Sequence, residues 1–279
     1  MALLLAPALV LVLGVIAYPL LLAVRYSLSD ATIGDDGTFV GLRQYAFLAR
    51  DPEYQAALWH TAVYTGLSLV LKLALGTAVA LALAAPFHGR RAVYAVLMLP
   101  LLFPVVMDSI AWYFLFSTVH GAFNEALMAL GVLRQPYAFT GTGGSALLVL
   151  VVINVWHGTP LVTMLAVAGL QSVPPDVLDS ARVDGARALA RFRHVQLPAL
   201  VPPLALAGLL AVLGTFGDYA SVHLVTAGGP GGETQVVSSL AFAEALRGGS
   251  LATGIAMALA VVPAYLVALV LAMRLVLRP

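Results

Sequence analysis

Six long stretches of almost entirely apolar residues constrain the fold of this chain more than any other feature. A helix needs about 20 mostly apolar residues to cross a hydrocarbon core of roughly 30 Å. The six stretches meet this length and cover residues 2–24, 61–85, 92–118, 145–170, 199–223 and 251–273. Every backbone polar group in lipid must be satisfied within the chain, and none of the stretches alternates as a barrel strand would. The sequence therefore predicts an all-α integral membrane protein with six transmembrane helices in a single domain over residues 1–279.

The composition supports the membrane assignment and excludes several other classes of protein. Hydrophobic residues make up 61% of the chain and charged residues 10%, whereas soluble domains are about half apolar and a quarter charged. No basic tract is longer than Arg90-Arg91, so we expect no nucleic-acid partner. The chain has no cysteine and its six histidines are scattered, so we expect no metal site. Because no basic residue precedes the first stretch, we expect a retained span rather than a cleaved signal peptide.

Arginines are distributed unevenly between the two sides of the predicted membrane, and this bias sets the expected orientation. Six spans place both termini on the same side. The residues on that side include Arg90, Arg91, Arg182, Arg187, Arg191, Arg193, Arg274 and Arg278. The other side has longer loops but fewer basic residues, namely Arg25, Arg43, Arg50, Arg134 and Arg247. We therefore expect both termini, and the loop between the fourth and fifth spans, to be cytoplasmic.

That cytoplasmic loop, residues 172–198, is compact and charged in an otherwise apolar chain. Apolar residues recur at helical spacing over 177–181 and again over 189–195, and Gly185 lies between the two patterns. We expect Pro198 to end the second helix, because proline disfavours helical conformation in the residue before it. The loop therefore predicts two short amphipathic helices that are joined at Gly185 and lie at the cytoplasmic surface.

The sequence DSARVDGARALARFRHVQLPALVP, which begins at Asp179, resembles the EAA loop of permease subunits of ATP-binding-cassette importers. The family pattern is E-A-A, two residues, D-G-A, then F, then I-x-L-P and a later P. The residues in register are Ala181, Asp184, Gly185, Ala186, Phe192, Val195, Leu197, Pro198 and Pro202. Asp179 and Ser180 replace the first Glu and Ala of the pattern, and the acidic character is retained.

Other segments extend the resemblance along the chain. FVGLRQYAFLARDPEY and LVTAGGPGGET resemble outer loops of sugar permeases, and TAVYTGLSLVLKLALGTAVALALA resembles their second helix. VWHGTPLVTMLAVAGLQSVPPDVLDSA resembles the helix that enters the EAA loop. The short segment after the last span is typical of the first permease subunit of maltose or glycerol-phosphate importers.

The resemblance implies a function and a set of partners. It implies a subunit that imports a solute of the sugar class by alternating access in a bacterial or archaeal cytoplasmic membrane. The EAA loop would be a coupling helix that docks on a cytoplasmic ATPase through Asp179, Ser180, Ala181, Asp184, Gly185, Ala186 and Phe192. Its implied partners are a second permease subunit, two ATPase subunits that bind ATP and Mg, and an extracytoplasmic solute-binding protein. The chain itself lacks the G-x-x-x-x-G-K-[ST] phosphate loop, so we expect no ATPase activity and no bound cofactor.

Polar and aromatic side chains at membrane depth are candidates for the solute path, because sugar sites combine aromatic faces with polar groups. They are Asp108, Trp112, Asn154, Trp156, His157 and Tyr219. Two other interpretations stay open: tryptophan and tyrosine also anchor helices at membrane interfaces, and Asn154 could simply bond a neighbouring helix.

Lys72 and Asp108 are ionisable residues within the second and third stretches. At 1.5 Å per residue, both should lie roughly 15 Å from the outer ends of their spans, near the membrane midplane. Ionisable groups at this depth are costly unless they are paired or hydrated. We therefore expect either a buried ion pair or two groups that face one water-filled cavity.

Two other classes of function remain open from the residues alone. An ion-coupled secondary transporter would show internal repeats and several intramembrane acids. An intramembrane enzyme would need a nucleophile and a base at membrane depth, for which Ser109 or Asp108 with His157 is conceivable. A neighbouring gene for an ATPase, a binding protein or a second permease would favour the importer over both.

Overall fold

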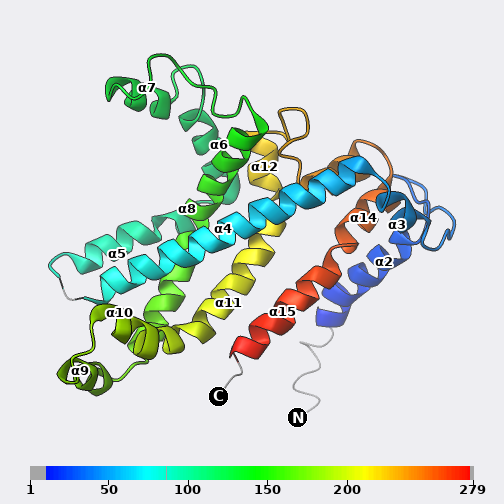
Figure 1. The fold of residues 1–279 in the computed structure, drawn as a ribbon. Helices are drawn as coiled ribbons and strands as arrows, with labels where there is room; N and C mark the ends of the chain where they lie inside the picture. Colours follow the sequence, from blue (N-terminus) through cyan, green and yellow to red (C-terminus); the bar gives the residue numbers. More distant parts are fainter. Residues whose placement is uncertain (1–10, 86, 277–279) are drawn as a thin grey trace, which may run out of the picture. The chain divides into compact units, whose positions relative to one another are not determined.

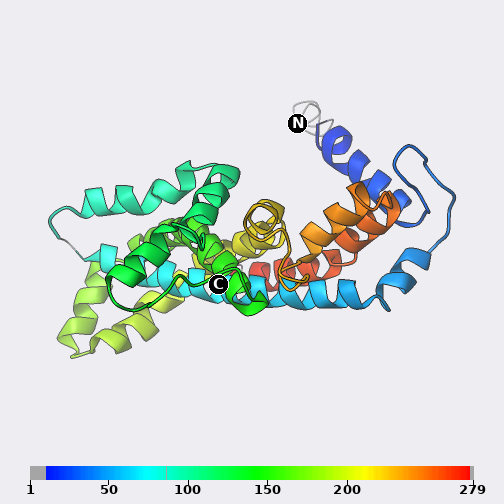
Figure 2. The same cartoon turned by 90° about the horizontal axis from the view of Figure 1, so that it is seen from above.

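The computed structural model describes residues 11–85 and 87–276, and in these residues the regular secondary structure is helical apart from two isolated β-bridges. This confirms the all-α prediction. The chain divides into two compact units. The first comprises residues 1–59 and 235–264, and the second comprises residues 60–234 and 265–279. The ribbon is shown in Figure 1 and from a second direction in Figure 2.

In the first unit, helix α14 (Leu251–Leu259) is the central element. It packs against α13 (Val237–Leu246), α2 (Tyr18–Ser27) and α3 (Arg43–Leu48). Figure 1 shows α2, α3 and α14 gathered together. The unit also holds the π-helical turn η1 (Val12–Ala17), the first turns of α4 (Pro52–Ala84) and the start of α15 (Val262–Val276).

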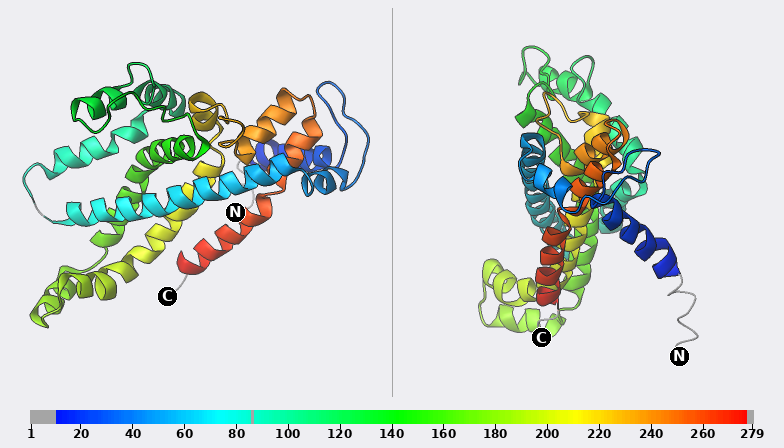
Figure 3. Two further views of the ribbon diagram at one scale, coloured as in Figure 1. Left: turned by 45° about the horizontal axis from the view of Figure 1, so that its top comes forward. Right: turned by 90° about the vertical axis from the view of Figure 1, so that its right-hand side faces the viewer.

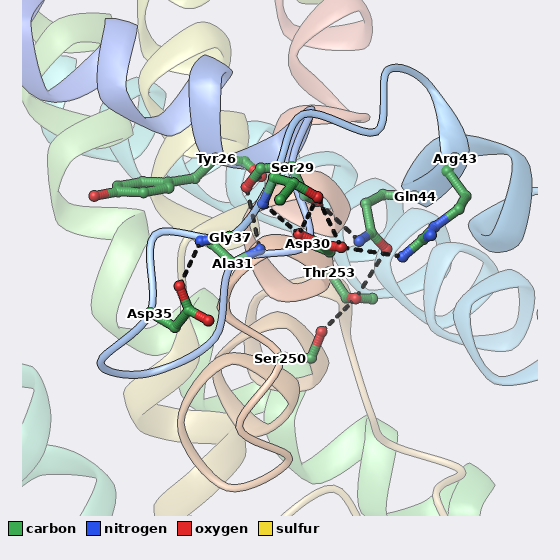
Figure 4. Close-up of polar contacts among 11 residues, drawn as sticks. Tyr26, Ser29, Asp30, Ala31, Asp35, Gly37, Arg43, Gln44, Ser250 and Thr253 are labelled. Atoms are coloured by element: carbon green, nitrogen blue, oxygen red, sulfur yellow. Dashed lines mark hydrogen bonds and ion pairs between the residues drawn. The ribbon is translucent and has the colours of Figure 1, made fainter.

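A loop between α2 and α3 is held by hydrogen bonds from side chains (Figure 4). The carboxylate of Asp30 accepts hydrogen bonds from the main-chain N–H and the hydroxyl of Thr38. Gln44 donates to the carbonyl of Ser29 and accepts from the hydroxyl of Thr253, which joins the loop to α14. Gly37 has a φ of +65°, and a Cβ there would lie 2.5 Å from the main-chain nitrogen of Ala31. The sequence therefore requires glycine at this turn.

The second unit is built on two long helices that pack side by side, α8 (Gly143–Gln171) and α11 (Leu197–Phe216). Ala80 of α4 joins the buried cluster formed by Ala166 and Leu200. The remaining elements are α5 (Arg90–Met98), η2 (Leu99–Leu102), α6 (Val105–Leu115), α7 (Ala122–Ala129), α9 (Pro175–Val183), α10 (Ala188–Arg191), η3 (Phe192–Gln196), α12 (Tyr219–Val225) and most of α15. Helix α12 packs against both α6 and α8.

Four helices among the described residues are long and apolar enough to span a membrane: Pro52–Ala84, Gly143–Gln171, Ala188–Phe216 and Leu251–Val276. These correspond to the second, fourth, fifth and sixth predicted stretches. The second begins at Pro52 rather than at residue 61, because Asp51 accepts hydrogen bonds from the first free N–H groups of Glu53 and Tyr54. Residues 2–10 of the first stretch lie outside the described residues, and the rest belongs to the shorter apolar helix Leu13–Ser27.

The third stretch is not the continuous helix expected over residues 92–118. Its two helical parts, Arg90–Leu102 and Val105–Leu115, meet at an angle of 101°. Phe103 is extended, with φ −86° and ψ 129°, because the proline at position 104 disfavours helical conformation in the residue before it. Together the two parts form one broken span or a re-entrant loop, which raises the number of candidate spans in the described part of the chain to five.

The fifth stretch differs from the prediction at both ends. It does not continue to residue 223, because the helix stops at Phe216 and a new helix, α12, begins after Gly217 and Asp218. At its other end, Pro198 does not end the preceding helix: α10, the π-helical turn η3 and α11 form one helix over Ala188–Phe216. The wider π turn before Pro198 accommodates a residue that lacks an amide hydrogen and crowds the preceding turn.

The hydrogen bond from the main-chain N–H of Thr38 lowers the pKa of Asp30 below its ordinary value of 3.8. A lowered pKa means that the carboxylate stabilises the loop at pH values above 3.8 and that this contribution is lost as the pH falls below it. We expect the Thr38 amide to lose hydrogen-exchange protection, corrected for intrinsic rates, as the pH falls through that range. The amide of Val40, which donates to the carbonyl of Leu28, is the control and should keep its protection. Parallel loss at both amides would contradict a specific role for Asp30.

Candidate functional site

A cavity of about 450 Å³ lies within the second unit. Its walls come from α4, α6, α8, α11 and α12, and from η2. Small residues of α11 and of the break after it, such as Ala211, Gly214 and Gly217, leave the space open. The volume lies in the range of small-molecule sites, about 300–1,000 Å³. The polar residues that line the cavity are Lys72, Asp108, Asn154, His157, Asp218 and Ser221.

Asp218 links three elements at one wall of this cavity. Its Oδ2 accepts hydrogen bonds from the hydroxyl of Tyr64 at 2.7 Å and from the amide of Asn154 at 3.0 Å. Its Oδ1 accepts from the main-chain N–H of Ser221 and so caps α12. The carboxylate therefore joins α4 and α8 to the point where α11 gives way to α12.

Lys72 lies at the same wall, and the residue is 4% exposed. Its ammonium donates to Thr215 Oγ1 at 2.9 Å, and the hydroxyl of Thr215 donates in turn to Asn154 Oδ1. The lysine stem lies across the bare backbone of α8, because a Cβ on Gly158 would fall 2.5 Å from Lys72 Cε. Glycine at 158 therefore leaves the room that the lysine occupies.

Asp108 bonds His157 rather than Lys72. His157 Nδ1 lies 3.0 Å from Asp108 Oδ2. The direct ion pair predicted between Lys72 and Asp108 is therefore wrong, because each side chain has a different partner. The second prediction, that the two groups face one cavity, agrees with the geometry, since both line it.

Ser109 does not complete a nucleophile–base pair with His157. Its hydroxyl donates to the carbonyl of Val105 at 2.7 Å and lies 3.2 Å from the hydroxyl of Ser221. The arrangement therefore gives no support to the nucleophilic use of Ser109 that an intramembrane enzyme would need.

Two of the three aromatic candidates, Trp112 and Trp156, pack together outside the cavity lining. Trp112 packs edge-on against Trp156, with ring centroids 5.5 Å apart, and stacks on Phe116 and Phe123. Tyr219 stacks on His223. Of the six residues predicted for the solute path, Asp108, Asn154 and His157 line the cavity, whereas Trp112, Trp156 and Tyr219 do not.

The charged segment after α8 has the predicted break at Gly185 between two helical parts, but the second part is not a short helix, because it continues into α11. Helix α9 ends at Val183, and Gly185 follows with a φ of +76°. The N–H of Gly185 donates to the carbonyl of Arg182, and the N–H of Ala186 donates to that of Ala181. These two bonds form a Schellman cap, which needs a residue in the left-handed region and therefore favours glycine. Figure 3 shows this hairpin in yellow-green at the end of α8.

The segment is anchored at one apolar residue and exposed at others. Phe192 packs against the buried cluster that contains Ala166 and Leu200. By contrast, Val183 is 88% exposed and Leu189 is 75% exposed. Asp179, Ser180, Asp184 and Gly185 are exposed, and Ala181 and Ala186 are half-buried. The apolar residues at helical spacing over 189–195 therefore do not form one packed face, since Phe192 packs inward and Leu189 does not.

Sequence reasoning missed the polar residues that organise the cavity wall, namely Tyr64, Thr215, Asp218 and Ser221. A charged residue at the end of an apolar stretch, directly after a glycine, was a usable signal for Asp218. Tyr64 and Thr215 gave no such signal, because a single hydroxyl in an apolar helix is common and its partners lie far away in the sequence.

Residues 61–278 match the family described as binding-protein-dependent transport system inner membrane components. Because this match covers most of the chain, the protein belongs to that family. It is therefore a membrane subunit of an ATP-binding-cassette importer, which confirms the resemblance found in the sequence.

Two relatives named as sugar permeases match most of the chain. The chain is 34% identical over 241 residues to a trehalose/maltose transport system permease protein of Thermococcus litoralis, covering 86% of this chain and 81% of the relative. It is 30% identical over 254 residues to a trehalose transport system permease protein of Mycobacterium tuberculosis, covering 90% and 80%.

A solved structure shows the same fold. The chain of a bacterial alginate ABC transporter, in complex with an alginate pentasaccharide-bound periplasmic protein, superposes with a TM-score of 0.82. It is 20% identical, and the superposition covers 96% of this chain and 91% of that one.

The contacts of Asp218 predict that its removal destabilises the second unit. In Asp218→Leu, the buried hydroxyl of Tyr64 and the amide of Asn154 lose their acceptor, at about 1–3 kcal/mol for each unsatisfied group. We expect a lower thermal unfolding midpoint in detergent, and partial recovery in the double variant with Tyr64→Phe. Ser68→Ala is the control on α4, because Ser68 Oγ is buried without a hydrogen-bond partner in the described residues. If the effects of Asp218→Leu and Tyr64→Phe on the unfolding midpoint simply add in the double variant, the hydrogen bond between the two side chains is not the cause of the destabilisation.

Proposed function

We propose that this protein is the transmembrane subunit that translocates a sugar, delivered by an extracytoplasmic binding protein, through alternating access coupled to a cytoplasmic ATPase. The observation that carries the proposal is the cavity, which places polar groups among apolar side chains, inside the part of the chain that matches the importer family. The proposed solute contacts in the cavity are Asp108, Asn154 and His157. Trp112, Trp156 and Tyr219 remain proposed contacts elsewhere along the path.

The sugar class rests on the relatives and on the chemistry of the cavity. Two relatives are named as permeases of trehalose/maltose and trehalose systems, and the alginate transporter has the same fold. The cavity offers an ammonium, a carboxylate, an imidazole and an amide among apolar side chains. Such a set can bond the hydroxyls of a sugar, which both donate and accept hydrogen bonds.

The proposed topology keeps six transmembrane segments in one permease domain, 1–279, with both termini in the cytoplasm. The bent pair Arg90–Leu102 and Val105–Leu115 would supply the third segment, and the helix that contains Leu13–Ser27 would supply the first. The excess of arginine in the loop after α8 and near the C-terminus supports this orientation.

The segment from α9 to η3 is the proposed coupling helix. Its exposed Val183 and Leu189 would contact an ATPase subunit, and Phe192 would hold the segment to α4, α8 and α11. A rigid helix fixed in this way can pass the motion of a bound partner into the spans on either side. The proposed assembly contains a second permease subunit and two ATPase subunits that bind ATP and Mg.

Reconstitution tests the proposed function. The purified chain should have no ATPase activity, because it lacks a phosphate-binding loop. Assembled in proteoliposomes with its ATPase, the second permease and the binding protein, it should support ATP hydrolysis that is stimulated by loaded binding protein and accompanied by sugar uptake. Nucleotide turnover by the isolated chain, or uptake without the ATPase, would refute the proposal and favour a different class of transporter.

Gly185 provides a sharper test of the coupling role. A β-branched residue in the left-handed region is strained by about 1–2 kcal/mol, so Gly185→Val should distort the Schellman cap between α9 and α10. We expect normal insertion but weaker stimulation of ATP hydrolysis and slower uptake. Gly89→Val is a matched control, since Gly89 has a φ of +83° and, like Gly185, has no atom within 4 Å of an added Cβ. Equal effects at both positions would assign the loss to backbone strain alone.

A further inference from the structure

We propose that the cavity of the second unit selects neutral sugars over acidic ones, and that Asp108 and Lys72 set this selection. The inference rests on the proposed function, because it takes the cavity as the path of the sugar. It goes beyond the fold similarity to the alginate transporter, whose polysaccharide is acidic.

The first observation is the charge balance of the cavity lining. Lys72 supplies one positive charge, and it is linked to the carboxylate of Asp218 through the hydroxyl of Thr215 and the amide of Asn154. Asp108 supplies a second carboxylate, which bonds His157. With a neutral imidazole the lining carries an excess of one negative charge, and with an imidazolium it is balanced. In neither state does the cavity have a surplus of positive charge.

This balance decides which solute is stable in the cavity. A charge in a poorly hydrated site is costly unless an opposite charge compensates it. The carboxylate of an acidic sugar would therefore meet Asp108 and Asp218 without a free positive charge to balance it. A neutral sugar brings no charge and needs hydrogen-bonding groups alone.

The second observation is the position of Lys72. An ammonium has three N–H donors, and one of them forms a hydrogen bond with a described residue, Thr215. The stem is confined by the backbone at Gly158, where a Cβ would lie 2.9 Å from the ammonium nitrogen. Lys72 is therefore a fixed donor for a sugar oxygen, and Asp108 is the residue that repels an anionic group.

The absence of cysteine from the sequence allows a direct test of this charge selection. Gly214 lines the cavity, and an added Cβ there meets no atom within 4 Å, so Gly214→Cys introduces a thiol without a clash. The purified chain carrying this change would be reacted with neutral, anionic and cationic methanethiosulfonates. The measured quantity is the rate with the anionic reagent divided by the rate with the neutral one, which cancels differences in thiol reactivity.

We expect this ratio to be lower at Gly214→Cys than at Leu130→Cys, a control position that is 76% exposed and does not line the cavity. Adding Asp108→Asn should raise the ratio at Gly214→Cys by about tenfold, the effect of one charge within about 10 Å at an effective dielectric constant of about 20. Adding Lys72→Gln should lower it. Neither addition should change the ratio at Leu130→Cys, and gel filtration would check that each variant is folded.

Three results would overturn the proposal. The first is that the anionic reagent reacts at Gly214→Cys as fast as the neutral one. The second is that Asp108→Asn leaves the ratio of the two rates unchanged, and the third is that no reagent reacts with the thiol at Gly214→Cys. The proposed function is tested separately in the assembled importer, where trehalose or maltose should slow the neutral reagent at Gly214→Cys. If neither sugar slows the neutral reagent and no sugar is taken up, the cavity is not the path of a sugar. If glucuronate is taken up in preference to maltose, the charge selection alone is refuted.

Discussion

The carboxylate of Asp218 is the group on which the organisation of the second unit depends. Helix α11 stops at Phe216, and the next helix can begin at Tyr219 because Asp218 accepts the N–H of Ser221. The same carboxylate accepts the hydroxyl of Tyr64 and the amide of Asn154. A break in a membrane helix leaves backbone groups unsatisfied unless side chains or neighbouring elements bond them. Asp218 meets this requirement and places the break against the cavity.

Glycine residues let the helices of this unit approach one another closely. A Cβ at Gly76 would lie 2.6 Å from Val162 Cγ1, and one at Gly169 would lie 2.7 Å from Pro203 Cγ. Close approach through small residues is typical of helix packing in membranes, where lipid is as apolar as the side chains. At Gly158 the absence of a side chain likewise makes room for the stem of Lys72. The packing of the helices and the placement of the buried cation therefore depend on the same kind of residue.

The sequence predicted the features that depend on local physical chemistry. The length and apolarity of three stretches predicted the long helices that end near Ala84, Gln171 and Val276. A single glycine predicted the break at Gly185. It did not predict where helices bend or continue. Pro104 breaks its stretch whereas Pro198 and Pro202 lie within a continuous helix, because a proline's effect depends on how the neighbouring turns adjust. The partner of Lys72 could not be predicted either, since Thr215 comes from a helix whose relative rotation the apolar pattern does not define. The sequence named Asp108 with His157 only as one conceivable pair for an enzyme, and this is the pair that the structure contains.

The continuity of the helix over Ala188–Phe216 connects the two parts of the proposed mechanism. Its first turn follows Gly185, within the proposed coupling segment, and its last turn carries Thr215, which bonds Lys72 at the cavity wall. At 1.5 Å per residue, 29 residues extend over about 43 Å. A helix that ended before Pro198, as the sequence predicted, would place a flexible joint between the segment and the cavity. Without that joint, a displacement of α10 would be transmitted along the helix to Thr215 and to the Gly217–Asp218 break. The Asp218 network would then be the place where the displacement changes the cavity.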